Sequence, residues 1–100
     1  MCKQILNFYL TEHAMYRGWD RSIDNQILYK VLPFVNAVEE DKKLVVVTPS
    51  FLASKKISGK AGHCLVLVLK QKLIKTGYWC KDPNYLFNTE KQASFQWLYM

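Results

Sequence analysis

The sequence predicts an α+β fold, with helices in its first third and strands in its second half. The helical signal is an apolar stripe at helical spacing, formed by Ile23, Ile27, Leu28 and Val31. The strand signal is a series of short β-branched runs. We therefore expect two N-terminal helices packed on a twisted, mainly antiparallel sheet. A chain of 100 residues supports one core, so residues 1–100 are predicted to form a single domain.

The first third of the chain is predicted to contain an extended segment and then the two helices. Residues 3–10 are β-rich and are expected to be a first strand or an extended lead-in. Thr11 can cap a helix over residues 12–19. Ser22 can cap a second helix, which carries the apolar stripe and which Pro33 ends or kinks.

The second half of the chain is predicted to contain strands at residues 44–48, 51–57, 63–69 and 73–79. The last two are expected to form a hairpin. Residues 63–69 are apolar at both odd and even positions, which indicates a central strand covered on both faces. The aromatic tail, residues 85–100, is expected to cover the second sheet face as a helix or an added strand.

The net charge of +6 is unevenly distributed along the chain. Residues 42–81 contain nine lysines and no acidic residue, whereas the segments on either side are net acidic. A long stretch of one sign in a compact domain indicates a positive surface for a polyanion, and nucleic acid is the usual one. The alternative is a lysine-rich surface that serves solubility.

Cysteine and histidine usage argues against a metal or disulfide framework. Cys2, Cys64 and Cys80 cannot all pair within one chain, and none has the spacing of a redox or zinc motif. We expect reduced thiols, no metal and no cofactor. No apolar run approaches the length of a membrane span, and no secretory signal is seen, so a cytoplasmic protein without membrane contact is expected.

The most informative motif is the segment His13-Ala-Met-Tyr-Arg17-Gly-Trp-Asp-Arg21. On a helix, His13 and Arg17 share one face, and Arg21 follows one turn later. An imidazole beside guanidinium groups suits phosphate, because the cations hold the anion while the histidine moves protons. The alternative is an ordinary surface helix whose arginines pair with neighbouring acids.

This motif, followed by a second helix, a strand pair and a closing strand, resembles small RNases of the barnase, EndoU, colicin and RelE superfamily, including BrnT-like toxins; the matching segments are residues 13–32 and, more weakly, residues 64–79. The resemblance implies a RelE/barnase-like fold with an RNA-cleaving site on the sheet near the first helix. It further implies that His13, Arg17 and Thr76 occupy positions of that site. Tyr78 lies two positions after Thr76, and strand periodicity places both on one side.

The chemistry of such a site follows from RNA itself. Because RNA carries its own 2′-hydroxyl nucleophile, cleavage needs a base, cations for the phosphate and an acid for the leaving oxygen. His13 would transfer protons, Arg17 would hold the phosphate, and Thr76 or Tyr78 would donate hydrogen bonds. His63 is the other candidate acid or base. The RNA-binding cations are predicted to be Arg21, Lys55, Lys56 and Lys60.

Three functions from different classes follow from these observations. The favoured one is a metal-independent endoribonuclease toxin that acts on tRNA or mRNA and is neutralised by an acidic antitoxin or immunity protein. The second is an RNA-binding module without catalysis, which uses exposed aromatic residues for stacking. The third is a basic protein that binds an acidic partner. A homodimer is compatible with each of the three.

Overall fold

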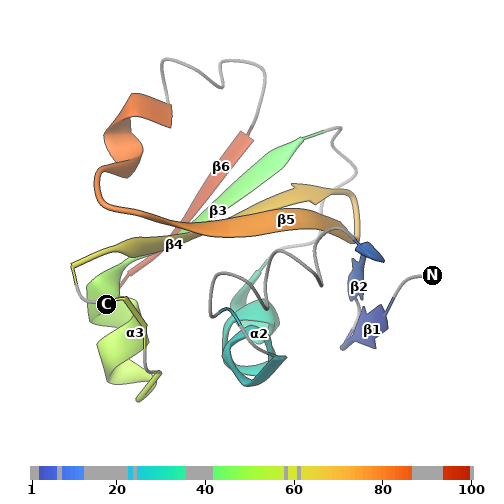
Figure 1. Cartoon of the computed structure of the whole chain (residues 1–100), viewed down its shortest axis with the longest axis horizontal. Helices are drawn as coiled ribbons and strands as arrows, with labels where there is room; N and C mark the ends of the chain where they lie inside the picture. The colour runs from blue at the N-terminus through green and yellow to red at the C-terminus, as the bar shows by residue number, and fades with distance from the viewer. Residues whose placement is uncertain are drawn as a thin grey trace.

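The computed structural model describes residues 3–6, 8–12, 23, 25–35, 42–57, 59–60, 62–86 and 94–99. In these residues, two α-helices pack against one face of a six-stranded mixed sheet, and a short 3-10 turn lies on the other face (Figure 1). The predicted α+β class is therefore confirmed. The first predicted N-terminal helix lies, beyond Glu12, outside the described residues.

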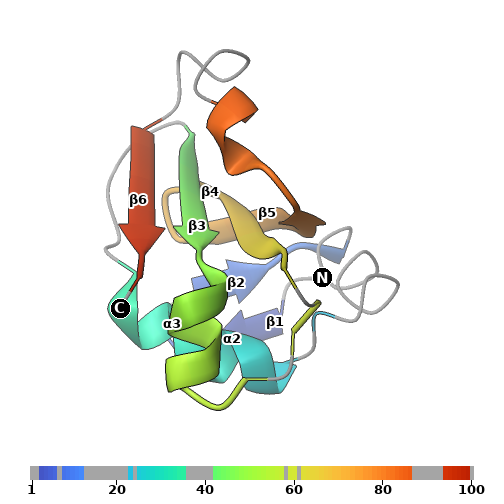
Figure 2. The ribbon, with the colours of Figure 1, turned by 90° about the vertical axis from the view of Figure 1, so that its left-hand side faces the viewer.

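The described elements, in chain order, are β1 (Lys3–Ile5), β2 (Phe8–Leu10), α2 (Asn25–Val31), η1 (Leu32–Phe34), β3 (Lys43–Val47), α3 (Pro49–Ser54), β4 (Cys64–Lys70), β5 (Leu73–Cys80), η2 (Pro83–Tyr85) and β6 (Ser94–Leu98). The strand order in the sheet is β1-β2-β5-β4-β3-β6. Pairs β1–β2, β3–β4 and β4–β5 are antiparallel, whereas β2–β5 and β3–β6 are parallel. Figure 2 shows β6 running beside β3 in the same direction.

The centre of the sheet is the predicted hairpin. Strands β4 and β5 are joined by a tight turn in which Gln71 adopts a left-handed conformation, with φ of 55°. Strand β4 lies between β5 and β3, and Leu65, Val66 and Leu67 on it are all buried. The expectation of a central strand covered on both faces is confirmed.

The prediction of a strand at residues 51–57 is wrong, because helix α3 begins at Pro49. Thr48 caps this helix: its hydroxyl oxygen accepts a hydrogen bond from the backbone N–H of Phe51 at 3.4 Å. Pro49 fits the first helical position, where a missing N–H costs nothing. The hydroxyl of Thr48 also donates to the carbonyl of Leu98 at 3.0 Å, so the start of α3 is tied to the end of β6.

The two ends of the chain add strands to opposite sides of this hairpin. The predicted segment 3–10 is divided into β1 and β2 by Leu6, whose φ is 55°. The tail supplies β6, which is the added-strand alternative. The second predicted helix is α2, which ends at Val31, and Pro33 lies in the 3-10 turn that follows, as expected.

The larger hydrophobic core lies between the sheet and the two helices. Alternate residues of the strands, such as Val45, Leu65 and Leu67, are buried there against α2 and α3. Gly77 of β5 belongs to the same side, where its Cα lies under Leu67 and Ile23: an added Cβ would come within 3.0 Å of the Leu67 side chain. This core covers one sheet face and leaves the other to a smaller cluster.

Candidate nucleic-acid interface

The sheet face turned away from α2 and α3 carries the predicted hydroxyl residues; we term it the second face (Figure 1). Strand register arranges its side chains in lateral rows. One row runs from β5 to β6 as Thr76, Val68, Leu44 and Phe95. The next row runs as Tyr78, Val66, Val46 and Trp97. Each row therefore has a hydroxyl side chain at one margin and a large aromatic ring at the other.

A β-bulge at Lys75 directs Thr76 and Tyr78 to this face. Leu69 pairs with Ile74 and Val68 pairs with Thr76, so Lys75 is the extra residue on β5. Ile74 packs in the helix-side core, whereas Tyr78 packs against the second-face cluster. The prediction that Thr76 and Tyr78 share one side of their strand is confirmed.

Exposure differs between the centre and the margins of the rows. Val46, Val66 and Leu44 at the centre are buried, and Leu86, which follows η2, belongs to the same cluster. At the margins, Thr76, Tyr78, Phe95 and Trp97 are half-buried. The chemistry that this face offers to a ligand therefore lies along β5 and β6, while the centre is a small second core.

Two cysteines lie at the end of the second face that is opposite the hairpin turn. Cys64 and Cys80 are direct cross-strand partners and are both buried free thiols. Burial raises the pKa of the Cys64 thiol, and the electrostatic influence of the neighbouring Cys80 and Asp82 raises it further. At neutral pH Cys64 is consequently protonated and a poor nucleophile, and both cysteines are free thiols, in agreement with the expectation of reduced thiols.

This environment predicts slow alkylation of Cys64 in the folded protein. At neutral pH, iodoacetamide should label Cys64 far more slowly in buffer than in denaturant, because unfolding removes both the burial and the charges that suppress the thiolate. The rates are measured by mass spectrometry of the peptide that contains Cys64. Equal rates in the two conditions would contradict the assignment.

The lysines predicted to bind RNA do not lie beside Thr76 and Tyr78. Lys55 is the C-cap of α3, on the helix side of the sheet, and its ammonium group lies 4.5 Å from the centre of the Phe34 ring. Lys56 and Lys60, both exposed, follow in the same connection to β4. The role of these three lysines in RNA binding stays a prediction, on a different part of the molecule from the second face.

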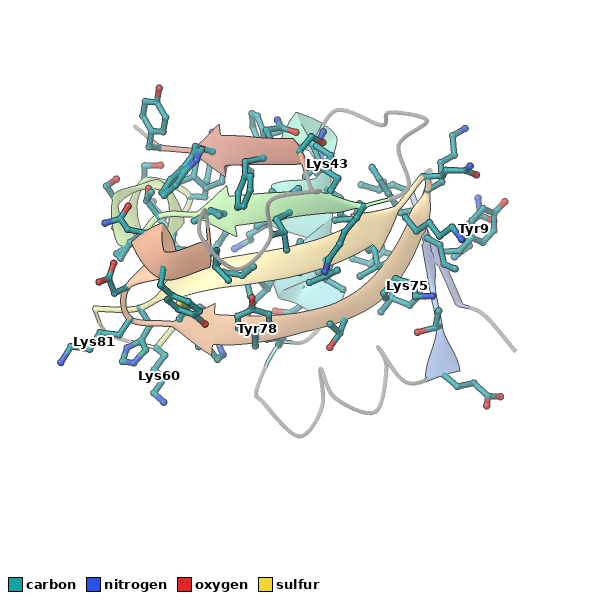
Figure 3. The ribbon with its side chains drawn as sticks, turned by 90° about the horizontal axis from the view of Figure 1, so that it is seen from above. Tyr9, Lys43, Lys60, Lys75, Tyr78 and Lys81 are labelled. Carbon is teal, nitrogen blue, oxygen red and sulfur yellow. The ribbon has the colours of Figure 1, made fainter. Side chains whose placement is uncertain are left out.

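The nine lysines of residues 42–81 do not form one continuous face. Figure 3 shows Lys60 and Lys81 at one end of the sheet and Lys75 at the other, beside Tyr9. Lys43 is buried, with 6% of its surface exposed. The expected single basic surface is therefore divided between the α3 end of the sheet and the end that holds the β4–β5 turn.

The remaining predicted site residues are the arginines and histidines. His13, Arg17 and Arg21 lie outside the described residues. His63 immediately precedes β4, is half-buried, and donates a backbone hydrogen bond to the carbonyl of Lys60 at 3.0 Å. Within the described part of the chain, no three His, Cys, Asp or Glu side chains gather as a metal site would require.

Three aromatic residues of the second face were not assigned to a site from the sequence. Phe95 and Trp97 are two positions apart in the tail, a period-two signal that becomes meaningful once residues 94–98 are known to be a strand. Tyr9 lies between the apolar residues Phe8 and Leu10, and on a strand this spacing places Tyr9 on the opposite face from its two neighbours. In the structure, Phe8 and Leu10 are buried in the helix-side core while Tyr9 is 43% exposed.

Comparisons with known proteins assign no family to the chain. No family model, curated protein or solved structure matches it. Among the described residues, no helix has the length and apolar character needed to cross a membrane. The function must therefore be argued from the site itself.

Proposed function

We propose that this chain is a cytoplasmic, metal-independent ribonuclease toxin that cleaves RNA by attack of the 2′-hydroxyl on the adjacent phosphate. The observation that carries the proposal is the placement of Thr76 and Tyr78 side by side on β5, on the face that the helices leave uncovered. An α+β fold with helices on one sheet face and hydroxyl side chains on the other is compatible with the RelE/barnase-like RNases that the sequence resembles.

The proposed reaction divides the work among few residues. His13 removes the proton from the 2′-hydroxyl, and the oxygen attacks phosphorus while the bond to the 5′-oxygen breaks. The proton taken up by His13 returns through solvent to the leaving 5′-oxygen, so the products are a 2′,3′-cyclic phosphate and a free 5′-hydroxyl. Arg17 neutralises the phosphate, and the hydroxyls of Thr76 and Tyr78 donate hydrogen bonds to the charged oxygens as the transition state forms.

A toxin of this kind needs a neutralising partner in the cell that makes it. The chain carries a net charge of +6, so the partner that fits is an acidic antitoxin or immunity protein. We propose that it covers the second face and thereby excludes tRNA or mRNA from Thr76 and Tyr78.

The hydroxyl groups provide the direct test of this site. Tyr78→Phe and Thr76→Val preserve shape while removing one donor each, and the loss of one transition-state donor typically lowers kcat by about 10²-fold. Total RNA is incubated with each purified variant in EDTA, and the cut ends are mapped for 2′,3′-cyclic phosphate. Tyr29→Phe is the matched control, because Tyr29 is an exposed tyrosine on the helix side.

The outcomes separate the proposal from its alternatives. Cleavage in EDTA that falls in the Tyr78 and Thr76 variants but not in Tyr29→Phe supports the proposal. Cleavage that requires added Mg²⁺, or that is unchanged in both second-face variants, contradicts it. Binding of RNA without any cleavage by the unmodified chain would favour a non-catalytic RNA-binding module instead.

A further inference from the structure

We infer that the end of the second face nearest the β4–β5 turn is a binding surface for single-stranded RNA, formed by one exposed tyrosine and three exposed lysines. We term this surface the hairpin-end patch; it comprises Tyr9, Lys70, Lys72 and Lys75. The inference rests on the proposed function, because it identifies where the RNA extends from the hydroxyl residues of β5.

Strand register brings the members of the patch together from distant parts of the chain. Tyr9 of β2 pairs with Leu73 of β5, and Leu73 pairs with Lys70 of β4. Their neighbours Leu10 and Ile74 are both in the helix-side core, so Tyr9 and Leu73 face the opposite side. Tyr9, Leu73 and Lys70 thus form a further lateral row of the second face, adjacent to the row that begins with Thr76.

Two more cations flank this row. Lys72 lies in the turn, where its carbonyl accepts a hydrogen bond from the backbone N–H of Tyr9 at 2.9 Å. Lys75 is the bulge residue and is exposed, and Figure 3 shows it at the same end as Tyr9. The patch therefore brings three exposed lysines and one exposed tyrosine to the same end of the sheet, and this combination binds phosphates and stacks a base in single-stranded nucleic acid.

The patch and the proposed reaction site lie in line along β5. Tyr78 is five residues beyond Leu73 on the strand, or about 16 Å at the usual rise of a β-strand. The half-buried side chain of Thr76 lies between them on the same face. An extended RNA strand whose scissile phosphate meets Tyr78 would reach the patch with its neighbouring nucleotides. Asp82 follows β5 at the opposite end, so its charge is remote from the patch.

The α3 end of the sheet provides a matched comparison, because the same change in charge can be made there at three other lysines. One variant carries Lys70→Gln, Lys72→Gln and Lys75→Gln; the other carries Lys55→Gln, Lys56→Gln and Lys60→Gln. All six lysines lie at or near the surface, so both variants should fold, which circular dichroism checks. The probe is a short fluorescent 2′-O-methyl oligouridine, which lacks the attacking hydroxyl and cannot be cleaved.

Affinity is measured by fluorescence anisotropy over a series of potassium chloride concentrations. Each lost phosphate contact on a single strand lowers the salt slope by about 0.7, so the hairpin-end variant should lose about 2 from the slope. The α3-end lysines are also predicted to bind RNA, but they lie on a different part of the molecule from the second face, so the α3-end variant should lose less of the slope. Tyr9→Ala should weaken binding roughly 5- to 150-fold, whereas Tyr9→Phe and Tyr29→Ala should not, because stacking needs a ring and the ring must lie in the patch.

The measurement distinguishes failure of this inference from failure of the proposed function. Equal losses in the two lysine variants, or a larger loss at the α3 end, would overturn the hairpin-end patch while leaving ribonuclease activity in place. An affinity of the wild-type chain that does not depend on salt would also overturn it. If the wild-type chain neither binds the probe nor cleaves total RNA, both the patch and the proposed function are wrong.

Discussion

Replacing His13 with alanine is expected to lower the rate of RNA cleavage by about 10²- to 10⁴-fold, the usual contribution of a group that transfers a proton in the transition state. Binding of the uncleavable 2′-O-methyl probe should change little, because an imidazole that moves protons contributes little charge at neutral pH. The rate is measured in EDTA with a defined RNA, and binding by anisotropy.

The second histidine of the chain is the natural comparison for His13. His63 precedes β4 at the end of the sheet away from the hairpin turn, so His63→Ala should retain most of the activity. A larger loss in His63→Ala than in His13→Ala would transfer the proton-transfer role to His63.

Arg17→Lys should also lower the rate of cleavage, because lysine keeps the charge but loses the planar fork that contacts two phosphate oxygens.

Replacing Leu65 with alanine is expected to lower the free energy of unfolding by about 2–5 kcal/mol. Leu65 lies on the central strand β4 within the helix-side core and has no exposed surface, so its truncation leaves a cavity that the flanking strands cannot fill. The total free energy of unfolding of a native protein is about 5–15 kcal/mol, so the variant should come close to losing its folded state. Denaturation with urea measures the change.

Leu6→Ala is the matched control for Leu65→Ala. Leu6 is 44% exposed, and its left-handed φ of 55° is equally unfavourable for leucine and alanine. The change in unfolding free energy should therefore stay within about 0.5 kcal/mol. Similar destabilisation by the two substitutions would mean that β4 is not at the centre of the core.

Local patterns predicted the elements whose decisive information is local. The β4–β5 hairpin was predicted because apolar runs and a polar turn lie next to each other in sequence. The same reasoning failed at α3, where Phe51 and Leu52 look like part of a strand. There the deciding feature is the Thr48-Pro49 start, which supplies a cap and a residue suited to the first helical turn.

The composition of the second face depends on pairings that no local pattern indicates. Periodicity placed Thr76 and Tyr78 on one side of their strand, but it did not indicate the bulge at Lys75 that sets which face they occupy. Tyr9 joins the face through a parallel pairing with Leu73. For the same reason, the lysines that look continuous in sequence are separated in space, because the strands between them carry the chain from one end of the sheet to the other.

The two parallel pairings also determine the order in which the molecule can assemble. Strands β4 and β5 pair across a short turn. By contrast, β2 can pair with β5, and β3 can pair with β6, only after the long stretch of chain between the two strands has been synthesised. Closing such long loops costs entropy before any contact is gained, so these pairings form late. During synthesis on a ribosome, the row that ends in Trp97 and the patch around Tyr9 would both be completed after the central hairpin, and a nascent chain would carry the hairpin before it carried a working surface.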